Sequence, residues 1–95
     1  MGVRTTRQAD QDIIGLYLRG AAEFGITQAE LYHEGLLATF AMLADNPRMA
    51  RERTKLRPPM RLHPWQSHLI AYVVEGDDIL IIRVLHGRQD WEQLL

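Results

Sequence analysis

The sequence predicts an α+β fold: a short N-terminal strand, an antiparallel helical hairpin, a three-stranded antiparallel meander and a short C-terminal helical turn. Apolar residues recur with a period of about 3.6 through the first half of the chain, which is the signature of amphipathic helices. The second half is rich in β-branched residues, and a glycine-aspartate turn divides it. A chain of 95 residues is too short for two cores, so we expect a single domain over residues 1–95.

The first half predicts two antiparallel helices. A short strand at residues 3–6 precedes the first helix, which spans residues 8–24 and can end at Gly25, because glycine adopts the left-handed conformation readily. Residues 27–30, Thr-Gln-Ala-Glu, fit a capping box, so the second helix begins there and ends before Pro47. So short a connection makes the helices pack antiparallel. Their aromatic residues have core spacing; they are Tyr17, Phe24, Tyr32 and Phe40.

The second half predicts strands at residues 60–64, 68–75 and 79–86. Glu75-Gly76-Asp77-Asp78 has good hairpin-turn chemistry between the last two strands. Residues 79–85 are apolar on both faces, as expected of a central strand that is covered on both sides. We expect an irregular connection over residues 47–60 and one helical turn in residues 90–95.

Composition excludes several classes of protein. Hydrophobic residues make up 46% and charged residues 24%, as in an ordinary folded domain. Cysteine is absent, so neither a disulfide nor a thiolate metal site is expected, which suits the cytoplasm. The longest apolar runs fall far below the roughly 20 residues that cross a bilayer. The polar N-terminus does not resemble a secretion signal.

The net charge of −1 is distributed unevenly. Residues 48–61 contain six basic residues and one acid, a net of +5, so the rest of the chain carries −6. Such a bipolar distribution suits an anionic target or partner at the basic segment. The alternative is that these charges only solvate a linker.

The sequence indicates neither a metal site nor a cofactor site. The four histidines lack a recognised ligand spacing, and no glycine-rich phosphate loop is present. Ser67 is the only serine and has no nucleophile-elbow motif around it. We therefore expect no cofactor, no metal and no small-molecule substrate.

The segment from Arg83 to Trp91 is the strongest candidate for a functional site. Period-two alternation puts Arg83 and Leu85 on one face of the strand, and Val84 and His86 on the other. Near the strand end, His86 and Arg88 could meet Arg61 and His63 in a cationic cluster suited to phosphate or carboxylate. In the alternative interpretation Arg83 pairs with a buried or partner carboxylate, while His86 and Asp90 merely hold the C-terminal turn.

These residues resemble a known family. Arg83-Val84-Leu85-His86-Gly87-Arg88-Gln89-Asp90 is similar to the C-terminal signature of ParE toxins. Further similar stretches cover nearly the whole chain in order: Ala9-x-x-Asp12-Ile13, Ala29-x-x-Tyr32, Leu43-Ala44-x-x-Pro47, Leu56-Arg57-Pro58 leading into Arg61, and His68-x-Ile70-x-Tyr72. The resemblance implies a fold shared with RelE and a role as the toxin of a type II toxin–antitoxin pair.

The resemblance also implies partners. A ParD-like ribbon-helix-helix antitoxin would wrap the toxin in a hetero-oligomer, and operator DNA would be bound only through that antitoxin. Two apolar helices leave more apolar surface than so small a meander can cover, and a partner helix could bury the excess. The residues expected at this contact are Ile13, Leu16, Tyr17, Tyr32, Leu36, Phe40 and Tyr72.

Two toxin mechanisms remain open. ParE toxins are described as poisons of DNA gyrase, whereas RelE relatives cut mRNA on the ribosome. If the chain is a ribonuclease, the catalytic candidates are Arg61, Arg83 and His86. The lysine-rich set and terminal tyrosine of RelE are not matched, so the sequence favours a binding inhibitor of gyrase over an enzyme. The residues expected at the target contact are Arg57, Arg61, His63, Arg83, His86, Arg88, Asp90 and Trp91.

Overall fold

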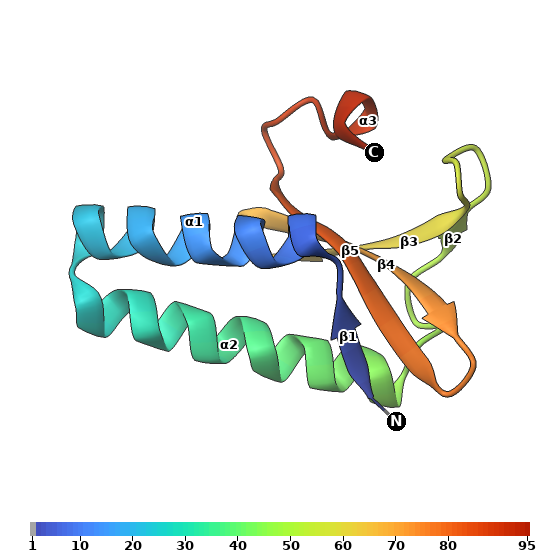
Figure 1. The fold of residues 1–95 in the computed structure, drawn as a ribbon, viewed down its shortest axis with the longest axis horizontal. Coiled ribbons are helices and arrows are strands. Elements are labelled where there is room, and N and C mark those ends of the chain that lie inside the picture. Colours follow the sequence, from blue (N-terminus) through green and yellow to red (C-terminus); the bar gives the residue numbers. More distant parts are fainter. Residues whose placement is uncertain (1) are drawn as a thin grey trace.

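A computed structural model describes residues 2–95 and confirms the α+β class (Figure 1). Its elements are β1 (Val3–Thr5), α1 (Arg7–Phe24), α2 (Ile26–Asp45), β2 (Glu52–Arg53), β3 (Met60–Trp65), β4 (His68–Glu75), β5 (Asp78–His86) and α3 (Trp91–Leu94). The strands form one sheet in the order β1-β5-β4-β3-β2. No helix within residues 2–95 combines the length and apolar character that crossing a bilayer requires.

The sheet contains the expected meander but is larger and mixed. Strands β3, β4 and β5 pair antiparallel, and Gly76 takes a positive φ of 59° in the turn between β4 and β5. Strand β1 joins β5 in parallel, with Val3 opposite Ile79. Strand β2 adds a fifth strand to the edge of β3, inside the segment where we expected irregular chain. Two residues are too few to show a β-type alternation, so the sequence gives no signal for this strand.

The helical hairpin is joined by a single residue. The Thr6 side chain caps α1 by accepting a hydrogen bond from the Ala9 backbone N–H, at 3.0 Å. Gly25, with φ of 92°, both ends α1 and precedes α2, which begins at Ile26. The predicted capping box at Thr27 is wrong, because Thr27 already lies in the first turn and α2 has no side-chain cap. The tip of the hairpin extends past the sheet (Figure 1).

The sheet has an apolar core on each face, as the central strand predicts. Leu36, Phe40 and Leu43 of α2 pack with Ala9 of α1 against the inward residues of β4 and β5. On the opposite face lies a second core of Met60, Leu62 and Ala71, which Leu56, Trp91 and Leu95 cover. Phe24 was expected in the core but is 70% exposed, because it lies at the projecting tip where there is no sheet to cover it.

A β-bulge interrupts β5. Ala71 pairs with Arg83 and Tyr72 pairs with Ile81, so Ile82 is an extra residue without a partner on β4. Ile79, Ile81 and Val84 therefore all pack in the helix-side core, whereas Ile82 packs in the core of the opposite face. The bulge thus keeps Val84 on the helix side of the sheet, although Val84 follows Ile81 by three positions and would face the other side in a regular strand.

Candidate functional site

A groove separates the projecting half of the hairpin from the end of the sheet. Its volume is about 1000 Å³. The residues that line it come from α1, α2 and the ends of β4 and β5: Leu16, Arg19, Gly20, Glu23, Phe24, Gln28, Ala29, Tyr32, Ser67, His68, His86 and Gln89. Because it combines apolar walls with converging polar groups, this groove is a candidate binding site.

Strand register builds a cluster of rings at the inner end of the groove. Trp65 of β3 pairs with His68 of β4, which pairs with His86 of β5. The His68 and His86 rings meet edge to face, with centroids 5.3 Å apart. Tyr32 of α2 places its hydroxyl 2.8 Å from His68 Nδ1 and its ring 4.7 Å from that of Trp65. One side chain of α2 therefore contacts two neighbouring strands.

Two members of the cluster have pKa values shifted toward their neutral forms. Burial lowers the pKa of His68, and the adjacent His86 and Arg19 lower it further. Burial raises the pKa of Tyr32. His86 Nδ1 accepts a hydrogen bond from the Arg88 backbone N–H at 3.1 Å, so the neutral ring carries its proton on Nε2. The Tyr32–His68 pair therefore presents hydrogen-bonding groups whose neutral forms are favoured on this wall of the groove.

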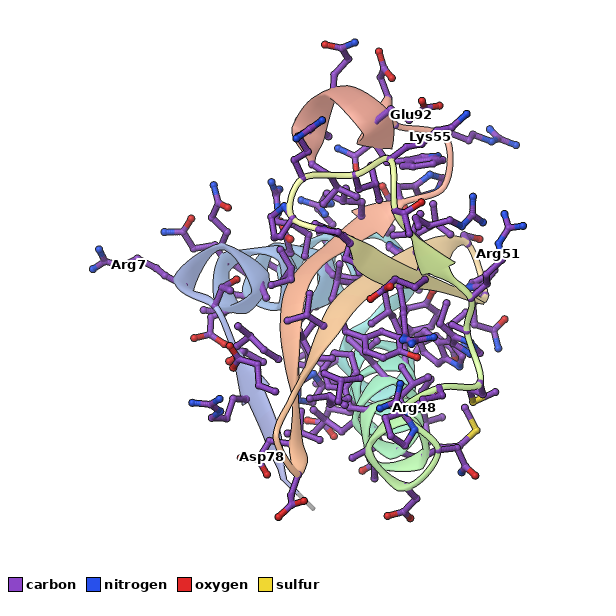
Figure 2. All side chains as sticks on the ribbon, turned by 90° about the vertical axis from the view of Figure 1, so that its right-hand side faces the viewer. Arg7, Arg48, Arg51, Lys55, Asp78 and Glu92 are labelled. Carbon is purple, nitrogen blue, oxygen red and sulfur yellow. The ribbon has the colours of Figure 1, made fainter. Side chains whose placement is uncertain are left out.

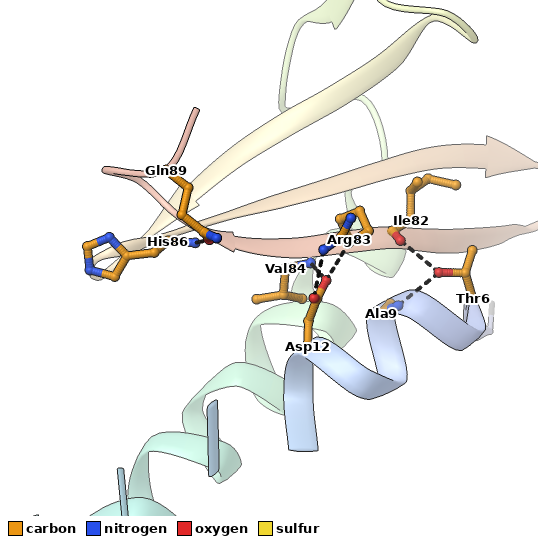
Figure 3. Close-up of polar contacts among 8 residues, drawn as sticks. All are labelled: Thr6, Ala9, Asp12, Ile82, Arg83, Val84, His86 and Gln89. Atoms are coloured by element: carbon orange, nitrogen blue, oxygen red, sulfur yellow. Dashed lines mark hydrogen bonds and ion pairs between the residues drawn. The ribbon is translucent and has the colours of Figure 1, made fainter. Parts of the chain in front are cut away.

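A second polar contact joins α1 to β5 beyond the end of β1. Arg83 Nε and Nη2 donate to the two carboxylate oxygens of Asp12 at 2.7 and 3.0 Å (Figure 3). Asp12 Oδ2 also accepts the backbone N–H of Val84 at 3.0 Å, and the Thr6 hydroxyl donates to Ile82 O at 2.7 Å. Asp12 and the N-cap residue Thr6 thus provide hydrogen-bond partners for backbone groups on the edge of β5 that β1 leaves unpaired.

The Asp12 contact determines the role of Arg83. The side chains of Arg83 and Asp12 are only 17% and 15% exposed. Hydrogen bonding to Asp12 raises the pKa of Arg83, so the guanidinium stays charged and internally paired. The alternative interpretation, in which Arg83 pairs with a buried carboxylate, is confirmed. Arg83 is therefore not available to the predicted cationic cluster.

The rest of that cluster does not assemble as predicted. Arg61 pairs with Tyr72, four residues along β3 from Trp65, which puts it roughly 13 Å along the strand from the row that contains His86. Its Nη1 donates to Ala50 O at 2.6 Å. His63 lies two strands away from β5, opposite Ile70. Of the four expected members, the structure brings only His86 and Arg88 together.

The end of β5 and the turn after it form an exposed polar surface. His86 donates its backbone N–H to the Gln89 side chain at 2.7 Å, which shapes the turn that exposes Arg88 (Figure 3). Asp90 precedes α3 and is exposed. Trp91 instead is half-buried and packs against the core of Met60, Leu62 and Ala71 on the opposite face of the sheet. Arg57 is exposed on the distant connection before β3.

The expected antitoxin residues divide into buried and accessible ones. Leu36 and Tyr72 are fully buried and Phe40 is 2% exposed, so these three residues offer no surface to a partner. Leu36 and Phe40 follow the apolar stripe of α2, and that stripe is the part of the helix that the sheet covers. Leu16 and Tyr32 line the groove, and Ile13 and Tyr17 are half-buried.

Sequence reasoning missed the apolar residues that the hairpin leaves exposed. They lie outside the predicted core stripes: Ile14, Leu18, Ile26, Leu31 and Met42. Ile14 and Leu18 are 59% and 61% exposed, and their spacing of four puts them on one face of α1. This spacing is the sequence signal that could have identified an exposed apolar face on α1. The Tyr32–His68 contact leaves no such signal in the sequence, since 36 positions separate its members.

Known proteins match this chain closely. The family model for the ParE toxin of the type II toxin–antitoxin system parDE matches residues 3–91. Toxin ParE1 of Caulobacter vibrioides is 35% identical over 87% of this chain and 85% of its own length. Toxin ParE3 of the same organism is 30% identical over 90% and 85%, respectively. Toxin ParE1 of Mycobacterium tuberculosis is 36% identical over 76% and 74%.

A solved structure, described as the chromosomal ParDE toxin–antitoxin system from P. aeruginosa, shares the fold. Its TM-score is 0.75 at 19% identity, with 90% of this chain and 95% of that chain covered. The groove, the ring cluster and the Asp12–Arg83 contact thus belong to a fold that already occurs in such a system. With the family model covering nearly all of its length, the chain belongs to the ParE family of toxins from type II toxin–antitoxin systems.

Proposed function

We propose that this toxin arrests growth by inhibiting DNA gyrase, and that a ParD-like antitoxin neutralises it by covering the helical hairpin. Family membership supports both parts. The matching P. aeruginosa structure is described as a ParDE system, which supports a hetero-oligomer with an antitoxin. Operator DNA is then bound through the ribbon-helix-helix part of the antitoxin, and the complex works in the cytoplasm.

The exposed apolar side chains of the hairpin carry the antitoxin part of the proposal. Ile14, Leu18 and Leu31 are each more than half exposed, and the tip adds Phe24 and Ile26 at 70% and 63%. Large apolar side chains concentrated on one supersecondary unit favour burial against a partner. An amphipathic helix that lies along the hairpin would remove them from water, with Leu16 and Tyr32 at the groove margin.

The exposed end of β5 supports a target contact at His86, Arg88 and Asp90. Arg57, Arg61 and His63 lie further away on β3 and the segment before it, so they would contact a large target at a second point. Ribosome-dependent RNA cleavage is less well supported. Its candidates were Arg61, Arg83 and His86, and the two arginines are engaged by Ala50 and Asp12 rather than gathered over one scissile bond.

Purified gyrase tests the target directly. The toxin should block ATP-dependent supercoiling of relaxed plasmid and trap cleaved DNA, and Arg88→Ala, which changes an exposed side chain, should weaken this inhibition at unchanged thermal stability. Supercoiling that proceeds normally at saturating toxin would remove gyrase as the target. Cleavage of mRNA at codon boundaries after induction would establish the ribonuclease alternative instead.

Antitoxin binding is tested by adding one charge to the hairpin. Leu18→Glu should abolish capture by the antitoxin encoded beside this gene, because a carboxylate would be buried in the apolar contact. Gln8→Glu adds the same charge to an exposed site at the start of α1 and should leave capture intact. Equal capture of wild type and Leu18→Glu would place the antitoxin elsewhere.

A further inference from the structure

The connection between α2 and β3 carries a group of exposed cations, which we call the basic face. Its members are Arg48, Arg51, Arg53, Lys55 and Arg57, all exposed. Glu52 is the only acid among them. Figure 2 shows Arg48, Arg51 and Lys55 on the side of the molecule opposite Arg7. The proposed toxin mechanism assigns a role to only one member, Arg57.

In the described part of the chain, no carboxylate forms an ion pair with these cations. Across residues 2–95, the ion pairs involve Arg4 and Arg83 only, and neither belongs to the basic face. Arg83 shows the contrasting case, since its guanidinium is held by both oxygens of Asp12. The charge of the basic face is therefore balanced by ions from outside the chain.

The segment that presents the cations is tied to the sheet. The Tyr72 hydroxyl donates to Pro47 O at 2.9 Å, and Arg61 Nη1 donates to Ala50 O at 2.6 Å. Strand β2 pairs with β3, and Leu56 packs against the second core. Because the backbone is fixed before any ligand arrives, binding orders only the side chains, which lowers its entropic cost.

The residue types indicate the ligand. Arginine's planar fork matches phosphate oxygens, and four of the five cations are arginines. No aromatic residue lies in residues 48–59, so the segment lacks the stacking platforms on which single-stranded nucleic acids are bound. The basic face with Glu52 carries a net charge of +4 and the rest of the chain −5, so the molecule would turn its basic face toward a polyanion.

We infer that the basic face binds the phosphate backbone of double-stranded DNA and does not select a sequence. This contact is separate from the antitoxin's recognition of an operator. It also does not depend on gyrase as the target, because it requires only the toxin and a duplex. Its role is to hold the toxin on DNA, where an enzyme that acts on DNA is encountered.

Fluorescence anisotropy of the full-length toxin, made by cell-free synthesis, tests the inference. The probe is a fluorescein-labelled duplex of roughly 20 base pairs with mixed sequence, long enough for several phosphate contacts. If four to five cations each replace a counterion, the logarithm of the association constant should fall with the logarithm of salt at a slope of about −4. Raising KCl from about 50 to 200 mM should then weaken binding by about two orders of magnitude.

Matched arginine variants locate the contact. Arg51→Gln should reduce the magnitude of the salt slope by about one and weaken binding several-fold. Arg7→Gln removes an equally exposed arginine from the opposite side and should change neither quantity. The triple variant Arg48→Gln, Arg51→Gln, Arg53→Gln should lose most of the salt dependence while its thermal melting matches wild type, since all three side chains are exposed.

Several results would overturn the inference. No binding at the lowest salt would mean that the cations only solvate the connection. An equal loss in Arg7→Gln would show that net charge, rather than this face, attracts DNA. Tighter binding to a duplex RNA of the same length would assign the surface to RNA, and a marked preference among DNA sequences would contradict backbone recognition.

Discussion

The helical hairpin is joined to the sheet by two polar contacts that differ in kind. Asp12 of α1 meets Arg83 and Val84 of β5 as a paired charge that uses three hydrogen bonds. Tyr32 of α2 meets His68 of β4 through one hydrogen bond between neutral groups. The first contact fixes the position of α1 firmly and does not respond to pH near neutrality. The second is weaker, lies in the groove and contains a group that titrates.

Removing Asp12 should have the largest effect on stability. Asp12→Ala leaves the Arg83 guanidinium and the Val84 N–H without a partner in a place that is mostly buried. We expect a loss of about 3 kcal/mol in the free energy of unfolding, measured by urea denaturation followed by circular dichroism. A loss below about 1 kcal/mol would mean that water replaces the carboxylate, and the difference between the two contacts would disappear.

Removing Arg83 should cost less than removing Asp12. In Arg83→Met the Asp12 carboxylate keeps the Val84 N–H, and methionine retains much of the packing of the arginine stem. We expect a loss of about 1 to 2 kcal/mol in the same assay. In a double-mutant cycle the losses from Asp12→Ala and Arg83→Met should not add. Additive losses would indicate that the two side chains do not stabilise the fold as a pair.

The neutral contact should contribute less still. Tyr32→Phe removes the hydroxyl bonded to His68 and leaves the ring against Trp65, so we expect a loss of about 1 kcal/mol. Tyr17→Phe is the matched control, because its hydroxyl reaches only an exposed Glu30 at 3.5 Å. Equal losses in both variants would show that the hydroxyl of Tyr32 has no special role.

The smallest effect should be a pH dependence that belongs to His68 alone. Its folded-state pKa is lowered, so the native state favours the neutral ring and the unfolded state binds the proton more readily. Stability from this group is present above the ordinary histidine pKa, about 6.5, and is lost as pH falls from there through the lowered value. Denaturation at several pH values should show a slope in this window that is reduced in His68→Gln. An unchanged slope would assign it to other groups.

Local pattern was sufficient to predict most of the secondary structure. The helices and β3 to β5 lie within a few residues of their predicted bounds, because each is long enough to repeat its apolar period several times. Pairing partners were harder. The parallel contact of β1 with β5 and the short strand β2 depend on chain segments that meet only in the fold. The bulge at Ile82 is also invisible in an unbroken apolar run.

The candidate site was only partly predictable for the same reason. Arg83 was identified as a residue with two possible roles, but its partner Asp12 lies 71 positions earlier in the chain. His68 and His86 belong to different strands, and only the register between these strands brings their rings together. The apolar stripe identified residues of the toxin's own core, whereas exposed hairpin residues such as Ile14, Leu18 and Leu31 lie off that stripe.

The extra residue in β5 has an unusual consequence for length variation in this strand. Deleting Ile82 would restore regular pairing with β4 and leave Ile81, Val84 and His86 facing the helices as they do now. Deleting a residue farther from the bulge, such as Leu80 or Leu85, would instead reverse inside and outside for the residues between the deletion and the bulge. A codon can therefore be lost at the bulge without inverting the molecule's interior, and a loss at Ile82 also keeps the side chains of the Arg83–Asp12 ion pair.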